Sequence, residues 1–182
     1  MLMSLAALLV GSCLLAQTSI VDPQAMALQD FEKRMNDYMS LHKSLSKGLA
    51  PTKPTTEPQT ILDRQDELVQ KIRDARKQAK QGDIFTPAIA KEFRRLIGLA
   101  MAAQKNNGDV KKSLARAEPV RLTLHVNDTY PAKIPLQSTP PTILLNLPRL
   151  PPELEYRIVG HALVLRDAVA NVVVDLIPDA IP

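Results

Sequence analysis

Apolar residues recur every three or four positions along the first half of the chain, which is the spacing of one face of an α-helix. The first such segment starts at Asp22-Pro23, where aspartate can cap a helix and proline fits its first turn, and it ends at Gly48. The pattern predicts one long helix whose buried face comprises Met26 or Leu28, Phe31, Met35, Tyr38, Leu41 or His42, and Leu45.

Two more helices are predicted after a proline-rich connector, residues 49–58. The second covers residues 59–81, where a seven-residue pattern gives the apolar positions Ile61, Leu68, Ile72, Ala75 and Ala79. The third covers residues 86–108, and its broader stripe consists of Ile89, Phe93, Leu96, Ile97, Ala100 and Met101. We expect the second helix to lie along the first as an antiparallel hairpin, and the three helices to bury one another's stripes.

The pattern changes from helical to alternating after residue 118. Residues 120–126 alternate without a break and predict a half-buried strand, and Ile143–Leu147 predicts a short strand between proline-rich turns. The runs LEYRIV, ALVLRD and VVVDLI predict the remaining strands. The fold class is therefore α+β: an N-terminal three-helix antiparallel bundle in residues 22–117, followed by a small antiparallel β-meander in residues 118–182.

One hairpin has a predictable register. Gly160-His161 separates two alternating runs, and glycine first in a two-residue loop suits a type II′ turn. Such a loop sets every pair outward from it, from Val159 opposite Ala162 to Glu155 opposite Arg166. We expect His161 at an exposed tip, an ion pair between Glu155 and Arg166, and one buried face made of Tyr156, Ile158, Leu163 and Leu165.

The first 21 residues contain no charged side chain. The apolar run from Leu5 to Ala16 has the length of a signal peptide and is short for a membrane-spanning helix, although the whole uncharged stretch could just span a bilayer. Cys13 follows Val-Gly-Ser, which resembles the lipobox of bacterial lipoproteins, so lipidation at Cys13 is a third interpretation. We favour a cleaved signal in residues 1–21, with the mature chain beginning between Gln17 and Leu28, over a retained anchor or a lipidated start. Because Cys13 is the only cysteine, no disulfide pair forms within the chain, and packing alone must stabilise it.

Composition and charge narrow the choice of partners. Aromatic residues make up 3% of the chain and Trp is absent, which disfavours sites that stack sugars or single-stranded nucleic acid on rings. Basic residues exceed acidic ones by five in residues 22–118, whereas residues 119–182 carry a net charge of −1. The residues that carry this excess form a candidate surface for binding an anionic membrane or a protein partner. Acidic residues are mixed in, so nucleic acid is not an expected partner and a solvated surface is the alternative. The residues are Lys71, Arg73, Arg76, Lys77, Lys80, Lys91, Arg94 and Arg95.

Catalytic motifs are missing from the sequence: it has no HExxH pair, no GxSxG elbow and no glycine-rich phosphate loop. The best catalytic candidate is His125 with Asp128 or Tyr130, which would suit an envelope hydrolase or transferase. The same stretch, NDTYP, is also an ordinary turn signal. We therefore assign no catalytic, cofactor-binding or metal-binding residue.

The C-terminal stretch LPPELEYRIVGHALVLRDAVANVVVDLIPDAIP resembles the tails of uncharacterised secreted bacterial proteins. The resemblance is confined to the last third of the chain; it implies export from a bacterial cell and brings no known activity or functional residues. We therefore expect an exported protein, periplasmic or secreted, that binds or assembles with another envelope protein through a sheet edge or the basic helical face. The alternatives are the hydrolase or transferase and a membrane-tethered structural spacer.

Overall fold

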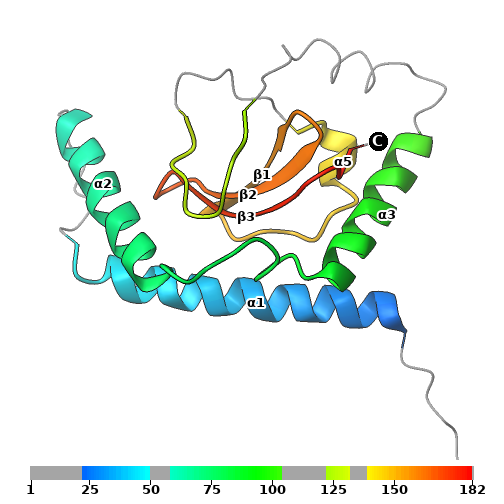
Figure 1. Ribbon diagram of the computed structural model, residues 1–182, viewed down its shortest axis with the longest axis horizontal. Helices are drawn as coiled ribbons and strands as arrows, with labels where there is room; N and C mark the ends of the chain where they lie inside the picture. The colour runs from blue at the N-terminus through cyan, green and yellow to red at the C-terminus, as the bar shows by residue number, and fades with distance from the viewer. Residues whose placement is uncertain (1–21, 50–57, 104–121, 132–138, 182) are drawn as a thin grey trace, which may run out of the picture.

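The computed structural model describes residues 22–49, 58–103, 122–131 and 139–181. A three-stranded sheet lies over the long helix α1 (Pro23–Ser46), while α2 (Pro58–Ala75) and α3 (Pro87–Ala103) stand near the two ends of α1 (Figure 1). The α+β class, with helices preceding an antiparallel sheet, is as predicted.

The antiparallel three-helix bundle is not confirmed. Both α2 and α3 pack on α1, but Figure 1 shows them rising steeply from it with the sheet between them. Their apolar faces therefore meet the sheet as well as α1: α3 shares a core with α1 and the sheet, whereas α2 packs with Leu45, Ala170 and Val172 in a separate, smaller cluster. In the described parts of the chain, no helix combines the length and apolarity needed to cross a membrane. The predicted signal segment, with Cys13, lies outside the described residues.

Helix α1 forms largely as its sequence pattern predicts. Asp22 Oδ1 accepts a hydrogen bond from the Gln24 amide at 2.9 Å, and Pro23 occupies the first turn. Of the two residues expected to start the buried face, Met26 is 54% exposed, whereas Leu28 is partly buried against the core. The buried face consists of Ala27, Phe31, Met35, Tyr38, Met39 and His42.

The other two helices end earlier than predicted. Helix α2 stops at Ala75 rather than Gln81, and Ile61 at its start is 56% exposed. Helix α3 ends at Ala103, and the residues that follow it up to 121 lie outside the described part. The predicted positions that are buried are Leu68 and Ile72 on α2 and Ile89, Phe93, Ile97 and Ala100 on α3. Leu96 and Met101 on α3 are partly buried and pack against the same core.

The sheet is a meander of β1 (Leu154–Val159), β2 (Ala162–Asp167) and β3 (Val172–Ile177) in that order. The predicted register of the first hairpin is confirmed at every pair, from Val159 opposite Ala162 to Glu155 opposite Arg166. Gly160 has a φ of 59°, as the turn requires. His161 is exposed at the tip, where its Nδ1 lies 2.9 Å from the Ile181 carbonyl oxygen.

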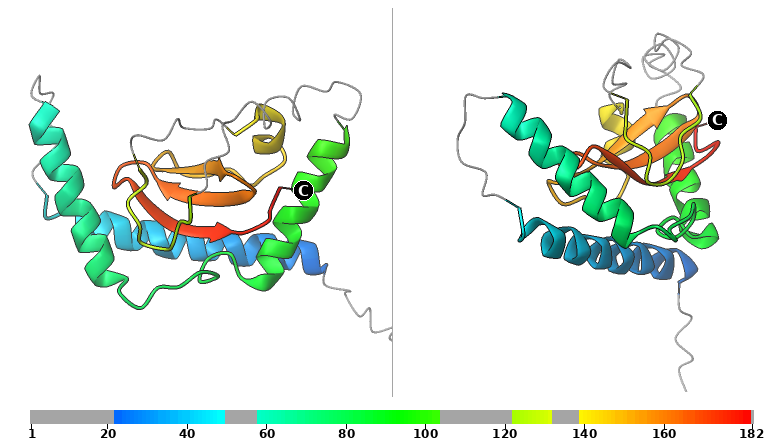
Figure 2. Two further views of the ribbon diagram at one scale, coloured as in Figure 1. Left: turned by 45° about the horizontal axis from the view of Figure 1, so that its top comes forward. Right: turned by 60° about the vertical axis from the view of Figure 1, so that its left-hand side comes forward.

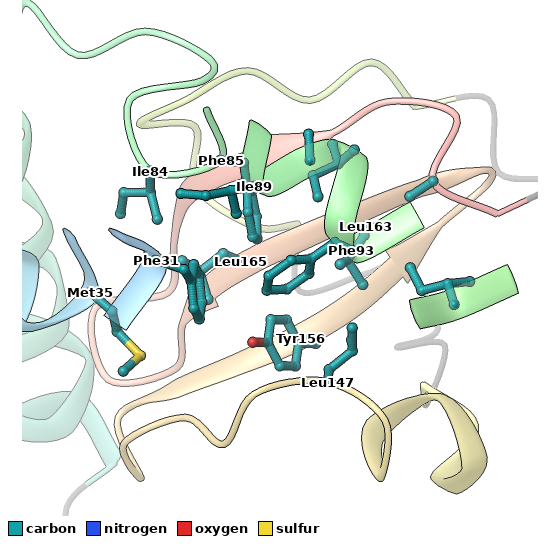
Figure 3. Close-up of a cluster of buried hydrophobic side chains, with 14 of the residues drawn as sticks. Phe31, Met35, Ile84, Phe85, Ile89, Phe93, Leu147, Tyr156, Leu163 and Leu165 are labelled. Atoms are coloured by element: carbon teal, nitrogen blue, oxygen red, sulfur yellow. The ribbon is translucent and has the colours of Figure 1, made fainter. Parts of the chain in front are cut away.

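One face of the sheet packs on the helices. The predicted set Tyr156, Ile158, Leu163 and Leu165 is buried in this core. Figure 3 shows the Phe31, Phe85 and Phe93 rings gathered beside Tyr156 and the two β2 leucines. Ring centroids are 4.9 Å apart for Phe31 and Phe93, and 6.0 Å apart for Phe93 and Tyr156. Edge-to-face contacts of this kind add to the stabilisation that burial gives.

The opposite face of the sheet is covered as well. Val159, Val164, Val173 and Leu176 pack there against Tyr130, from the segment 122–131. Figure 2 shows this segment crossing the sheet on the side away from α1. Burial on both faces explains why β3 has no exposed position and is apolar except for Asp175.

Two predicted strands are wrong. Residues 122–126 form no strand; the chain turns at Asn127, which has a φ of 69°, and residues 127–130 then pair with the outer edge of β3. The Asn127 amide donates to the Val173 carbonyl oxygen, and the Val173 amide donates to that of Asp128, both at 2.9 Å. The first backbone hydrogen bond of this described segment to the sheet is made by Asn127, so pairing begins only after the alternating run has ended.

The second wrong strand is Ile143–Leu147. Pro141–Leu144 instead forms the short helix α5, followed by a turn. Proline presets the backbone angle of a first helical turn, which favours a helix start over an extended strand. Ile143 and Leu147 are still the residues that this segment buries.

A buried carboxylate holds the loop between α2 and α3 on the sheet. Asp175, fully buried on β3, accepts hydrogen bonds from the amides of Gly82 at 3.0 Å and of Ile84 and Phe85 at 2.8 Å. The carboxylate thus takes up amide donors that the core would otherwise leave unpaired.

Replacing Gly160 with valine tests the hairpin turn. No atom lies within 4 Å of a side-chain carbon added at Gly160, so any loss of stability must come from the positive φ. We expect Gly160→Val to lower the free energy of unfolding by about 1 to 2 kcal/mol in urea denaturation.

Gly98 on α3 is the matched control, because a Cβ there also meets open space and the backbone is helical. Gly98→Ala should stabilise the protein by about 0.5 to 1 kcal/mol. A Gly160→Val protein as stable as the wild type would contradict the assigned turn.

Candidate functional site

The structure brings together two of the three residues proposed for a hydrolase. His125 Nδ1 lies 3.3 Å from Asp128 Oδ2, and the same oxygen accepts the His125 amide at 2.7 Å. The two side chains are 73% and 42% exposed. Tyr130 is buried instead, with its ring 4.9 Å from the Arg166 guanidinium. This is the geometry of an aspartate-capped turn, as the turn interpretation of NDTYP predicts.

The basic residues proposed as one face are divided between α3 on one side and α2 with the loop after it on the other, and Figure 1 shows the two helices well apart. On the α2 side, Arg73 Nε donates to the Asn127 carbonyl oxygen at 2.9 Å. Arg76 Nη2 donates to that of Val174 at 2.9 Å, and its guanidinium lies 5.2 Å from the centre of the Tyr38 ring. Both arginines therefore bind the helix to the rest of the protein.

Three further members of the set also have partners within the chain. Arg94 donates to the Pro178 carbonyl oxygen at 2.9 Å, Arg95 pairs with Glu92, and Lys71 pairs with Glu67 at 2.8 Å. The remaining residues Lys77, Lys80 and Lys91 are exposed. Binding of polyanions by these residues stays a prediction, for two separate surfaces instead of one.

Sequence analysis missed a buried polar cluster centred on Asp167, the last residue of β2. Its Oδ2 accepts the Tyr38 hydroxyl at 2.7 Å and lies 2.6 Å from His42 Nδ1, which must then donate. Its Oδ1 accepts the amides of Val169 at 3.0 Å and Ala170 at 2.9 Å. One fully buried carboxylate thus joins α1 to the turn between β2 and β3.

The sequence does carry a signal for this cluster. Alternation along β2 puts Asp167 on the face of Leu163 and Leu165, and a carboxylate on a buried face needs donors. Tyr38 and His42 are four residues apart and thus lie on one side of the predicted helix. Neither pattern says that this side of the helix meets this end of the strand.

A cavity of about 300 Å³ lies beside this cluster, between α1 and the loop that follows α2. Tyr38, Arg34 and Arg76 line it together with Asp37 and Asp83, so cationic and anionic side chains balance there. His42 is not part of its wall. Burial lowers the pKa of the Arg76 guanidinium, whose bonds here go to neutral oxygen atoms. These contacts connect α1 to the loop, and their balanced charge favours no particular ligand.

A second and larger cavity, of about 450 Å³, follows the outer edge of β1. Tyr156 and Leu154 reach it from the helix-facing side of the strand, and Glu155 and Arg157 reach it from the other side. Side chains on both faces of one strand can line the same cavity only along the edge of that strand. The outer wall comes from the segment after Thr139, with Leu144, Pro148, Arg149 and Leu150.

A charged cluster lies at this edge. Glu155 pairs with Arg157 and, at 2.6 Å, with Arg166, so the predicted Glu155–Arg166 pair is confirmed. Arg166 also donates to Asn171 and covers the Tyr130 ring. One carboxylate is thus shared by two guanidinium groups.

Neither a protein-family model nor a curated protein nor a solved structure matches this chain. The resemblance of the C-terminal stretch to secreted bacterial proteins therefore stays a prediction. The edge of β1, with its cavity and charged cluster, is the candidate site that the geometry offers.

Replacing Asp167 with asparagine tests the buried cluster. In either orientation the new amide nitrogen would face two donors, because each carboxylate oxygen accepts two hydrogen bonds. We expect Asp167→Asn to lower the free energy of unfolding by about 2 kcal/mol or more. Asp37→Asn is the control, since Asp37 is exposed and pairs only with Lys33, and it should change stability by less than about 0.5 kcal/mol. Equal effects of the two changes would contradict a stabilising role for the cluster.

The three tyrosines give a pH test. Burial raises the pKa of all three; the Asp167 carboxylate raises that of Tyr38 further, while Arg157 and Arg166 partly oppose the rise at Tyr130. Unfolded tyrosine ionises near about pH 10. Above that pH the folded state binds more protons than the unfolded state, so stability falls as pH rises.

We expect phenolate absorbance to stay low above about pH 10 and then to appear together with loss of the circular dichroism signal. The chain denatured in guanidinium should titrate near about pH 10 and serves as the control. Gradual ionisation at that pH with the fold retained would contradict the buried positions.

Proposed function

We propose that this protein is an exported binding or assembly protein, and that an extended segment of another envelope protein adds to the outer edge of β1. The observation that carries the proposal is the 450 Å³ cavity along that edge, lined from both faces of the strand. Addition of a strand to a sheet edge is a common mode of peptide recognition.

The hairpin geometry identifies which backbone groups face the cavity. In a two-residue hairpin the pair next to the loop, Val159 and Ala162, exchanges hydrogen bonds, and bonded pairs then alternate along the strands. Tyr156 and Ile158 therefore direct their amides and carbonyls away from β2. The Thr139 hydroxyl donates to the Tyr156 carbonyl oxygen at 2.9 Å, which confirms this direction. Among the described residues no acceptor is found for the Tyr156 or Ile158 amide.

The opposite edge of the sheet is already used. Residues 127–130 pair with β3, as described above, so a partner strand has one described edge left to join. Apolar side chains continue outward from the β1 cavity, where Leu144 is 42% exposed and Leu145 is 84% exposed. An exposed leucine pair next to an open strand edge favours a partner with apolar side chains.

Export is the part of the proposal that rests on sequence, namely on the uncharged, apolar first 21 residues and on the C-terminal resemblance. Two alternatives are kept. A hydrolase or transferase would use His125 with Asp128, whose contact lies in an exposed turn. A membrane-tethered spacer would need a retained or lipidated N-terminus.

Amide hydrogen exchange measured by NMR tests the edge. In the free protein the amides of Arg157 and Val159, which face β2, should exchange slowly, and those of Tyr156 and Ile158 should exchange faster. Peptides selected from a random display library on the purified protein should then slow exchange at Tyr156 and Ile158.

The control is built into the strand, because Arg157 and Val159 alternate with the reporting residues Tyr156 and Ile158 and should not change. Slow exchange of Tyr156 and Ile158 in the free protein would show that the chain itself covers the edge, and would overturn the proposal. A selection that yields no binding peptide would overturn it too.

A further inference from the structure

We infer that the segment bound at β1 carries an acidic side chain, which Arg157 and Arg149 recognise. This inference rests on the proposed function. It concerns what the cavity selects rather than whether a strand docks there.

The first observation is an unpaired donor. Arg157 Nε is buried and has no hydrogen-bond partner among the described residues, although the same guanidinium pairs with Glu155 through Nη2. A buried N–H without an acceptor is costly. Arg157, the residue that carries this N–H, is one of those that line the cavity.

The second observation is the charge around that donor. Glu155 is shared between Arg157 and Arg166, so it neutralises only one of the two guanidinium groups. Arg149 adds a further cation to the same cavity, is exposed, and forms no ion pair with any described residue. The site therefore carries an excess of positive charge at the place where a donor lacks a partner.

A carboxylate on the bound segment would account for both observations. It accepts hydrogen bonds from guanidinium groups in a planar, charge-assisted geometry, and it would supply the acceptor that Arg157 Nε lacks. Arg149 would also bind this carboxylate, and the ion pairs of Glu155 would not have to rearrange.

The strand geometry predicts where that carboxylate lies in the bound segment. Side chains of a strand alternate between faces, and Arg157 is on the face of β1 opposite to Tyr156. An added strand would therefore direct acidic side chains toward Arg157 and apolar ones toward Tyr156 and Leu154. The bound segment is expected to alternate between apolar and acidic residues.

Selection from a display library of random peptides, presented without a free C-terminal carboxylate, tests the inference on the purified protein. We expect enriched peptides to alternate apolar residues with Asp or Glu. A selected peptide should lose about tenfold in affinity when its acidic residues become Asn or Gln. Raising the salt concentration should weaken the acidic peptide more than its amide counterpart.

Two variants of the protein locate the effect. Arg149→Gln should lower affinity for the acidic peptide by about three- to tenfold and leave the amide peptide unchanged. Arg157→Gln should do the same to a greater extent, with its melting temperature checked because Arg157 also pairs with Glu155. Lys77→Gln is the matched control, an exposed cation just beyond α2 and outside the β1 cavity, and should change neither affinity.

The outcomes separate the two proposals. Peptides that bind and slow exchange at Tyr156 and Ile158, but bind equally well with their acidic residues amidated, would overturn the carboxylate inference and leave edge docking standing. Loss of acidic preference with Lys77→Gln to the same extent as with Arg149→Gln would also overturn it, as a general charge effect. Failure to select any peptide would overturn both proposals.

Discussion

The arrangement of helices around the sheet depends on buried carboxylates, each of which needs hydrogen-bond donors. Asp167 and Asp175 are the two fully buried aspartates of the sheet, and each accepts four hydrogen bonds. Asp167 draws its donors from α1 and from the turn after β2, while Asp175 draws three of its four from the loop between α2 and α3. These two side chains add directional contacts to apolar packing, which by itself would let the helices slide over the sheet.

This fixed arrangement decides which surface is left for a partner. The helices and the segment 145–150 cover one face of the sheet, residues 122–131 cover the other, and residues 127–130 also pair with the outer edge of β3. The edge of β1 is the remaining described route to the sheet, and it carries the 450 Å³ cavity and the unpaired Arg157 donor. The candidate site thus follows from what the rest of the fold covers.

The burial of the few aromatic residues also limits how a partner could be recognised. All three phenylalanines and all three tyrosines are buried, so the described surface has no ring on which a sugar or a base could stack. The proposed recognition at β1 would therefore rely on backbone pairing, leucine side chains and guanidinium groups. Those are the means by which a sheet edge binds an extended peptide.

The local sequence determined the helix starts, the hairpin turn at Gly160-His161 and the β1–β2 register. Caps, turns and side-chain alternation depend on interactions between residues that are close in sequence. The sequence alone also indicated the buried set of that hairpin and the Glu155–Arg166 pair. Only the tertiary structure decided that α2 and α3 separate around the sheet, that residues 122–126 pair with no strand, and that Tyr38, His42 and Asp167 meet. Tyr38 and Asp167 are 129 residues apart, and no local pattern specifies which helix face a distant carboxylate will find. The same holds for the cavity at β1, since its two walls meet through tertiary contacts such as the Thr139–Tyr156 hydrogen bond, which no local pattern specifies.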